Sequence, residues 1–137
     1  MRAALLAAGK GVRLRPITLS CPKSLIPAAG VSLLEYQLAA LRSLGFRDAL
    51  VVVGHLSSSV EGRLGDGSPL GIRIEYVHQD EQLGTGHAVS LLEGRVSGSF
   101  LLLFSDVFIP LDGLRSLVES PGPGYSAAVV RVPDPWN

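Results

Sequence analysis

The sequence contains a single cysteine, Cys21, so it can form neither an internal disulfide nor a cluster of cysteine metal ligands. It also lacks a long apolar run. The N-terminal apolar stretch, residues 3–8, is too short for a membrane-spanning helix or for the core of a signal peptide. These absences predict a protein of the reducing cytoplasm that has no membrane partner.

Charge is scarce and balanced, because charged residues make up 18% of the chain and the formal net charge is zero. A general attraction to nucleic acid is therefore not expected. No acidic residue occurs before Glu35, however, whereas several basic residues do. This local excess of positive charge favours an anion-binding site near the N-terminus. The basic residues concerned are Arg2, Lys10, Arg13, Arg15 and Lys23.

The chain has 137 residues, of which 47% are hydrophobic, and this predicts one globular domain over residues 1–137. Strands are predicted at residues 2–7, 48–54, 72–78, 99–106 and 125–132. Helices are predicted between them at residues 32–45, 57–67, 85–95 and 112–118, the last one capped by Asp112. Apolar strands that alternate with helices form parallel sheets covered on both faces. The pattern therefore predicts a three-layer α/β/α, Rossmann-like fold with a mostly parallel sheet.

Ligands of such sheets bind beyond the carboxyl ends of the strands. Three polar segments are expected at that edge: the glycine-rich loop after the first strand, residues 79–88 after the third, and Asp106 after the fourth. The sequence therefore predicts one site to which all three segments contribute.

The glycine-rich loop favours a phosphate ligand, since Gly9 and Gly11 would let backbone amides approach an anion closely. A nicotinamide-binding loop is disfavoured, because Leu14 stands where its third glycine is expected. An ATP-binding P-loop is also disfavoured, because Lys10 is followed by glycine and not by serine or threonine.

The wider strings "LAAGKGVRLRPIT" and "CPKSLIPAAG" resemble the signature of the sugar-1-phosphate nucleotidylyltransferases. Residues 6–16, the pair Pro22 and Lys23, and residues 27–30 match that signature. The resemblance implies that the loop holds a nucleotide and that Lys23 acts on the phosphates at the reacting centre. The implied nucleotide-binding residues of the loop are Leu6, Ala7, Ala8, Gly9, Gly11 and Arg13.

The chemistry of phosphate transfer agrees with these roles. A phosphorus atom under attack gathers negative charge on its oxygens, which fixed cations and amide donors stabilise. Arg13 offers a bidentate fork and Lys23 a mobile point charge. No side-chain nucleophile is needed, because the sugar phosphate itself attacks. The predicted catalytic residues are therefore Arg13, Lys23 and Asp106.

The segment "QDEQLGTGHA" resembles the base-recognition stretch of the uridylyltransferases that make UDP-N-acetylglucosamine. The resemblance implies contacts with a pyrimidine from Gln79, Gly84 and Thr85, and Gln82 is predicted to bind the nucleotide as well. Thr85 can equally be the cap of an ordinary helix. The histidines show no metal-ligand spacing and are interpreted as loop or cap residues; they are His55, His78 and His87.

Asp106 directly follows an apolar strand, and in the family that this chain resembles an aspartate here binds Mg²⁺. Carboxylate oxygens suit that ion. The preceding residue is Ser105, where the family usually has glycine, and this departure concerns the sugar contact more than the metal.

The expected reaction is transfer of a nucleotidyl group from UTP or dTTP to glucose-1-phosphate or N-acetylglucosamine-1-phosphate, with release of pyrophosphate. A guanylyltransferase of the GDP-mannose type and an inactive regulatory subunit of the same fold are the alternatives. The resemblance also implies a homo-oligomer. The family's Glu-Lys-Pro sugar motif and its second acidic metal ligand are not found here, so a C-terminally incomplete domain is expected that binds nucleotide weakly and turns over little sugar phosphate by itself.

Overall fold

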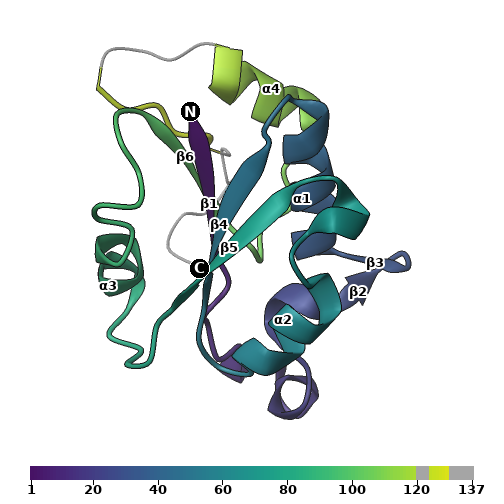
Figure 1. The fold of residues 1–137 in the computed structure, drawn as a ribbon. Coiled ribbons are helices and arrows are strands. Elements are labelled where there is room, and N and C mark those ends of the chain that lie inside the picture. Colours follow the sequence, from purple (N-terminus) through teal and green to yellow (C-terminus); the bar gives the residue numbers. More distant parts are fainter. Residues whose placement is uncertain (120–123, 130–137) are drawn as a thin grey trace.

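The computed structural model describes residues 1–119 and 124–129 and contains a four-stranded parallel sheet. The strand order is β5-β4-β1-β6, with β1 between β4 and β6 (Figure 1). The strands are β1 (Arg2–Leu6), β4 (Asp48–Val53), β5 (Arg73–His78) and β6 (Phe100–Phe104). A short antiparallel hairpin is formed by β2 (Pro27–Ala28) and β3 (Val31–Ser32).

Helices cover both faces of the sheet, which confirms the predicted three-layer α/β/α architecture (Figure 1). One face carries α1 (Leu33–Ser43), α2 (Ser57–Leu64) and α4 (Leu111–Glu119), and the other carries α3 (Thr85–Ser90). Alternate residues of a strand point to opposite faces. Accordingly Leu5 of β1 packs with the residues under α1, while its neighbour Ala4 packs with those under α3.

The sequence dictates the position of α1 directly. Ser32 and Glu35 form the predicted capping box, in which the Ser32 hydroxyl accepts from the Glu35 amide and the Glu35 carboxylate accepts from the Ser32 amide. The apolar stripe of the helix is fully buried on the sheet at Leu34, Leu38 and Leu41. The chain between β1 and this hairpin consists of short 3₁₀ turns. They are Val12–Leu14, Ile17–Leu19 and Lys23–Leu25.

Three predicted elements differ from the structure. The helix expected over residues 85–95 ends at Ser90, because the amides of Leu92, Glu93 and Arg95 then bond to carbonyls three residues back instead of four. Asp112 lies in the first turn of α4 and not at its cap.

The strand expected at residues 125–132 was wrong for residues 125–129, which form no strand; residues 130–132 lie outside the described part of the chain. Tyr125 and Val129 are 93% and 89% exposed, and residues 125–129 pair with no strand of the described part of the chain. Strand formation depends on such pairing more than on intrinsic preference.

The connection from α2 to β5 contains a turn that requires glycine. Gly67 has φ +84°, a left-handed conformation, and its carbonyl accepts from the amides of Leu70 and Ile72. A Cβ atom added at Gly67 would lie 1.9 Å from the carbonyl oxygen of Ile72. The turn therefore accepts no side chain without moving the start of β5.

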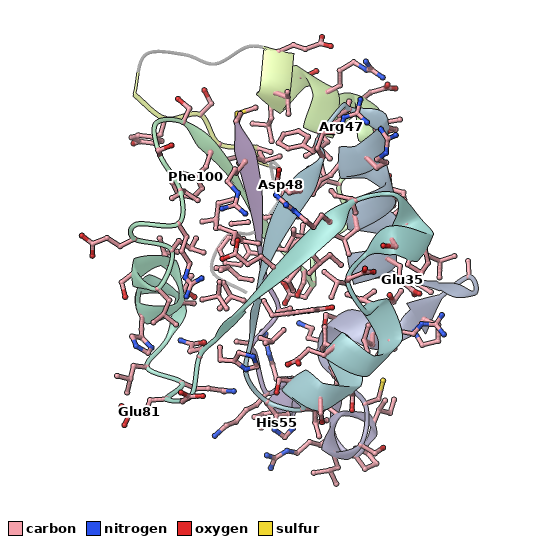
Figure 2. All side chains as sticks on the ribbon, in the orientation of Figure 1. Glu35, Arg47, Asp48, His55, Glu81 and Phe100 are labelled. Carbon is pink, nitrogen blue, oxygen red and sulfur yellow. The ribbon has the colours of Figure 1, made fainter. Side chains whose placement is uncertain are left out.

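The labelled side chains identify the two ends of the parallel strands. Figure 2 shows Asp48 and Arg47 near one end, with His55 and Glu81 near the other. Asp48 begins β4, so the end near His55 is the carboxyl edge, where the predicted site residues gather. Within the described residues, no helix is both long enough and apolar enough to cross a membrane.

Candidate active site

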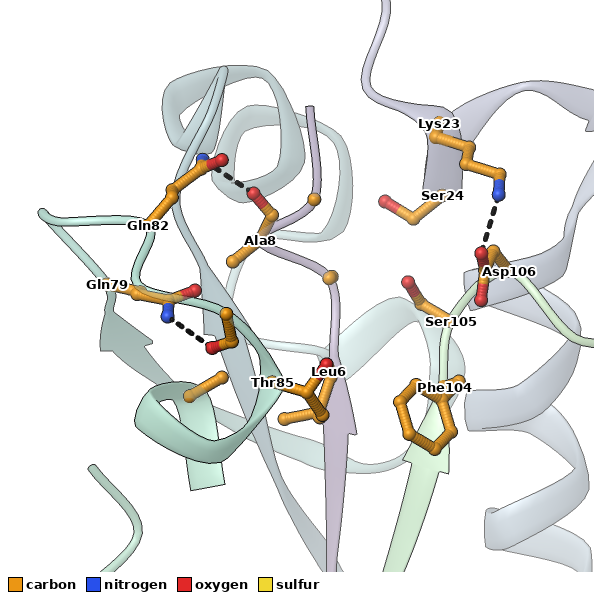
Figure 3. A pocket seen from close by; sticks show the side chains of 14 residues that line it. Leu6, Ala8, Lys23, Ser24, Gln79, Gln82, Thr85, Phe104, Ser105 and Asp106 are labelled. Atoms are coloured by element: carbon orange, nitrogen blue, oxygen red, sulfur yellow. Dashed lines mark hydrogen bonds and ion pairs between the residues drawn. The ribbon is translucent and has the colours of Figure 1, made fainter. Parts of the chain in front are cut away.

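A cleft of about 280 Å³ lies at the carboxyl edge of the sheet, beyond β1, β5 and β6 (Figure 3). All three segments predicted to meet at this edge line it. The lining residues are Leu6, Ala7, Ala8, Gly9, Lys23, Ser24, Gln79, Gln82, Gly84, Thr85, Ala88, Phe104, Ser105 and Asp106. The structure thus brings together most of the site residues predicted from the sequence.

The glycine-rich loop continues β1 across the middle of this cleft. The Ala7 amide donates to the Val52 carbonyl at 2.8 Å, and the Ser105 amide donates to the Leu6 carbonyl at 3.2 Å. Hydrogen bonding therefore reaches the last residue of β1 on the β6 side and extends one residue past it on the β4 side. This fixes the loop backbone rigidly up to the point where Gly9 turns away.

The segment after β5 forms one wall, in which Gln82 bonds to the glycine-rich loop and Gln79 bonds within the segment itself. The side-chain nitrogen of Gln82 donates to the Ala8 carbonyl at 2.7 Å, and that of Gln79 donates to the Gly84 carbonyl at 3.1 Å (Figure 3). Gln79 is buried, with 5% exposure, so its amide is held by the protein and not by water. This wall offers the kind of fixed amide groups that read the edge of a base.

The opposite wall carries the charged groups. Lys23 Nζ lies 2.5 Å from Asp106 Oδ2, and both side chains remain about one third exposed, at 31% and 39% (Figure 3). Lys23 comes from a 3₁₀ turn far from β6 in sequence, and Asp106 stands two residues after β6 ends. Lys23 and Asp106 contact each other and both face the cleft. Each side chain can therefore attract a ligand group of the opposite charge.

The donor set around Asp106 fits a magnesium ion bound largely by a substrate. Among the residues that line the cleft, Asp106 is the one carboxylate, and the described part of the chain contains no cluster of three or more metal-ligating side chains. Mg²⁺ is commonly held by one or two carboxylates together with substrate phosphates and water. Asp106 can supply such a carboxylate beside the phosphate-binding loop.

Gly11 and Arg13 are the two predicted site residues that do not line the cleft. Gly11 has φ +59°, accepts from the Thr18 hydroxyl through its carbonyl, and packs so closely that an added Cβ would lie 2.8 Å from Thr18 Cγ2 and 3.1 Å from Lys23 Cβ. It therefore shapes the loop that carries Lys23. Arg13 lies exposed in the adjacent 3₁₀ turn.

Arg2 does not belong to the expected N-terminal cluster of cations. It begins β1 and lies at the opposite edge of the sheet, where it donates to Asp48 at 2.7 Å and to Glu75 at 2.9 Å. The hydrogen bond from Arg2 holds the pKa of the Glu75 carboxyl below its usual value. Arg2 therefore links β1 to β4 and β5 at the amino-terminal ends of the strands. The predicted site lies at the carboxyl ends, so Arg2 does not contribute to it.

The interpretation of the histidines as loop or cap residues holds for His55, which lies in a turn. His78 ends β5 and faces Glu61 at 3.5 Å, away from the residues that line the cleft. His87 lies inside α3, with its Nδ1 atom 3.1 Å from Gln79 Nε2. The sequence analysis missed this contact, and its one signal is the position of His87 two residues after Thr85.

Comparisons with known proteins agree with this geometry. The family model described as nucleotidyl transferase matches residues 2–130. The chain is 33% identical to a mannose-1-phosphate guanylyltransferase of Mycobacterium tuberculosis over 97% of its own length, and 34% identical to a glucose-1-phosphate thymidylyltransferase of Streptomyces griseus over 98%. It spans 38% and 39% of the lengths of these two relatives.

Among solved structures, the chain superposes with a TM-score of 0.79 on a protein of Bacillus anthracis, described as a glucose-1-phosphate thymidylyltransferase in complex with sucrose. The two are 29% identical, and the match covers 87% of this chain and 49% of the other. Sequence signature, parallel sheet and cleft all agree with these matches. The chain belongs to the nucleotidyl transferase family, an enzyme family whose members include sugar-1-phosphate nucleotidyltransferases.

Proposed function

We propose that this chain provides the nucleotide-binding part of a sugar-1-phosphate nucleotidyltransferase. The observation that carries the proposal is the cleft itself, in which a fixed amide wall, a glycine-rich backbone and the Lys23–Asp106 pair face one another. A nucleoside triphosphate has the matching order of groups: a base edge, a ribose and a chain of phosphates. In the proposed reaction an oxygen of the sugar phosphate attacks the α-phosphorus, and the bond to the β-phosphate breaks to release pyrophosphate.

The residues of this chain bind and orient in that reaction. The backbone from Ala7 to Gly9 presents the phosphates to Lys23, whose charge stabilises the oxygens on the phosphorus under attack. Asp106 would hold Mg²⁺ when the ion enters with the triphosphate; the ion neutralises phosphate charge. Arg13 would reach the triphosphate from the turn beside the cleft.

We favour UTP or dTTP as the nucleotide donor and glucose-1-phosphate or its N-acetylamino analogue as the acceptor. Gln79 and the segment up to Thr85 form the wall that the resemblance to uridylyltransferases assigns to the base. A guanylyltransferase is the second candidate, because one of the similar relatives transfers to mannose-1-phosphate. The intact contact between Lys23 and Asp106 favours an enzyme over an inactive subunit.

The proposal is tested by calorimetric titration of the purified chain with UTP, dTTP, GTP, CTP and ATP in the presence of Mg²⁺, with NAD as a control. We expect UTP or dTTP to bind most tightly and NAD not to bind. Release of pyrophosphate is then assayed with a panel of sugar phosphates. Failure of every triphosphate to bind would refute the proposal.

Substitution of Asp106 by asparagine is expected to remove the effect of Mg²⁺ on triphosphate binding. The substitution keeps the shape of the side chain and removes the charge that attracts the cation. The measurement is the Kd for UTP with Mg²⁺ and with a chelator. In the wild type Mg²⁺ should tighten binding, whereas in Asp106→Asn the two values should agree.

The matched control is Asp112→Asn, which removes an exposed carboxylate from the first turn of α4. It should behave as the wild type does. A wild-type response to Mg²⁺ in Asp106→Asn would mean that the metal is held elsewhere.

A further inference from the structure

His87 makes a side-chain contact that the proposed reaction does not use. Its Nδ1 atom lies 3.1 Å from Nε2 of Gln79, and the same nitrogen of Gln79 lies 3.1 Å from the carbonyl oxygen of Gly84. Gln79 is buried and His87 is half-buried, so the contact between these two side chains is largely shielded from water, whereas Gly84 is exposed. The three residues form a short chain of hydrogen bonds along the base-facing wall of the cleft.

The Gly84 carbonyl determines the direction of this chain. A backbone carbonyl can only accept, so the atom of Gln79 that faces it must be the NH₂ group; the reversed amide would place two oxygens 3.1 Å apart. The amide nitrogen has two hydrogens, one for Gly84 and one for His87. Nδ1 of His87 must then be the acceptor, which places the proton of the neutral ring on Nε2.

The consequence concerns the other half of the Gln79 amide. With the nitrogen engaged by Gly84 and His87, the carbonyl oxygen Oε1 is left for a ligand, and Figure 3 shows it on the side of the amide that faces Ala8 and the cleft. An oxygen at this position can accept a hydrogen bond but cannot donate one.

Such an acceptor distinguishes between bases. Uracil and thymine carry a ring N–H at N3, and guanine carries one at N1, and each can donate to Oε1. The corresponding ring nitrogens of cytosine and adenine are lone-pair acceptors, which a carbonyl oxygen repels. A reversed Gln79 amide would have the opposite preference.

We propose that His87 is a positioning residue: Gly84 sets the direction of the Gln79 amide, and His87 accepts the second N–H hydrogen and so keeps the amide in place with its oxygen toward the base. This arrangement favours bases with a ring N–H. The inference rests on the proposed nucleotide-binding function and goes further, because it gives a part in base selectivity to a residue that lines no part of the cleft.

The test compares two substitutions of similar size, His87→Asn and His87→Leu. Asparagine places an acceptor oxygen close to where histidine has Nδ1, whereas leucine offers none. The quantity measured is the ratio of the Kd values for CTP and UTP. We expect Asn to keep the wild-type ratio and Leu to lower it by about tenfold, since a buried amide loses its fixed partner.

Two further variants calibrate that measurement. Gln79→Ala removes the reading group and should give the lowest ratio. His78→Leu removes a histidine at the end of β5 that contacts Glu61 and should leave the ratio unchanged. Equal ratios for wild type and His87→Leu, with a lowered ratio for Gln79→Ala, would overturn the role of His87 while leaving the proposed function standing.

A measurement without nucleotide keeps the inference independent of binding and of the stability of the variants. Nitrogen NMR of the ¹⁵N-labelled wild-type chain at alkaline pH, where a histidine ring is neutral, reports which ring nitrogen carries the proton. We expect a protonated Nε2 and an unprotonated Nδ1 at His87. The opposite tautomer would overturn the proposal, whatever the titrations show.

Discussion

Substitution of Lys23 by alanine is expected to slow the release of pyrophosphate by about 10²–10³-fold, the loss that follows removal of one preorganised charge donor at a reacting centre. Lys23 lines the cleft, and its ammonium group lies 2.5 Å from Asp106 Oδ2. No other lysine or arginine lines the cleft within the described residues, and Arg13 stands in the turn beside it. The fold should be unaffected, because the Lys23 side chain is partly exposed and makes no core contact.

The control for Lys23 is Arg73→Ala, which removes the same charge from the start of β5 at the opposite edge of the sheet. The Arg73 side chain is 78% exposed and reaches Asp48 only at 4.0 Å. Its variant should keep wild-type turnover and the wild-type Kd for UTP with Mg²⁺. For Lys23→Ala, a change of threefold or less in both quantities would show that Lys23 does not act on the phosphates.

Substitution of Gly67 by alanine is expected to lower the free energy of unfolding by about 4 kcal/mol, a large share of the stability of a typical domain. Two effects combine. The residue has φ +84°, which strains any side chain, and the new Cβ would meet the Ile72 carbonyl at 1.9 Å. That carbonyl directly precedes β5, so relief of the clash must displace an edge strand of the sheet. The measurement is urea unfolding followed by circular dichroism.

Gly45→Ala separates the two effects. Gly45 has φ +92°, close to that of Gly67, and nothing lies within 4 Å of the position of an added Cβ. Alanine there should cost only the backbone strain, about 2 kcal/mol. If both variants lose the same free energy of unfolding, the close approach of Gly67 to Ile72 is not present in the protein.

The elements that the sequence predicted well are those whose burial is complete. The buried positions of β1, β4 and the capped helix α1 are apolar except for Gln37 of α1, and Ser32 with Glu35 marks the start of the helix. The short α3 and the unformed strand at residues 125–129 were not predictable in the same way. In both segments the local preference for a helix or a strand is not supported by packing against the rest of the protein. Such packing cannot be read from one sequence.

The candidate site could be predicted in composition but not in detail. Strand ends determine which segments meet, so Gln79 and Asp106 could be placed at one end of the sheet from the topology, whereas Lys23, in the irregular chain after β1, was placed by the resemblance. The contact between His87 and Gln79 depends on how the loop between them folds back. The prediction that Arg2 belongs to the anion site was wrong. Its charge suggested that site, but Arg2 begins β1 and therefore lies at the end of the sheet opposite the cleft.

The order of the sheet also bears on how the chain is made. β1 is synthesised first, yet its backbone gains partners on both sides only when residues 48–53 and then residues 100–104 have followed. During translation at least one edge of β1 therefore stays open until residues 100–104 have emerged, a period in which a nascent polypeptide is exposed to wrong pairing. Ser105 and Asp106 directly follow β6, so they take their places in the cleft when β6 pairs with β1.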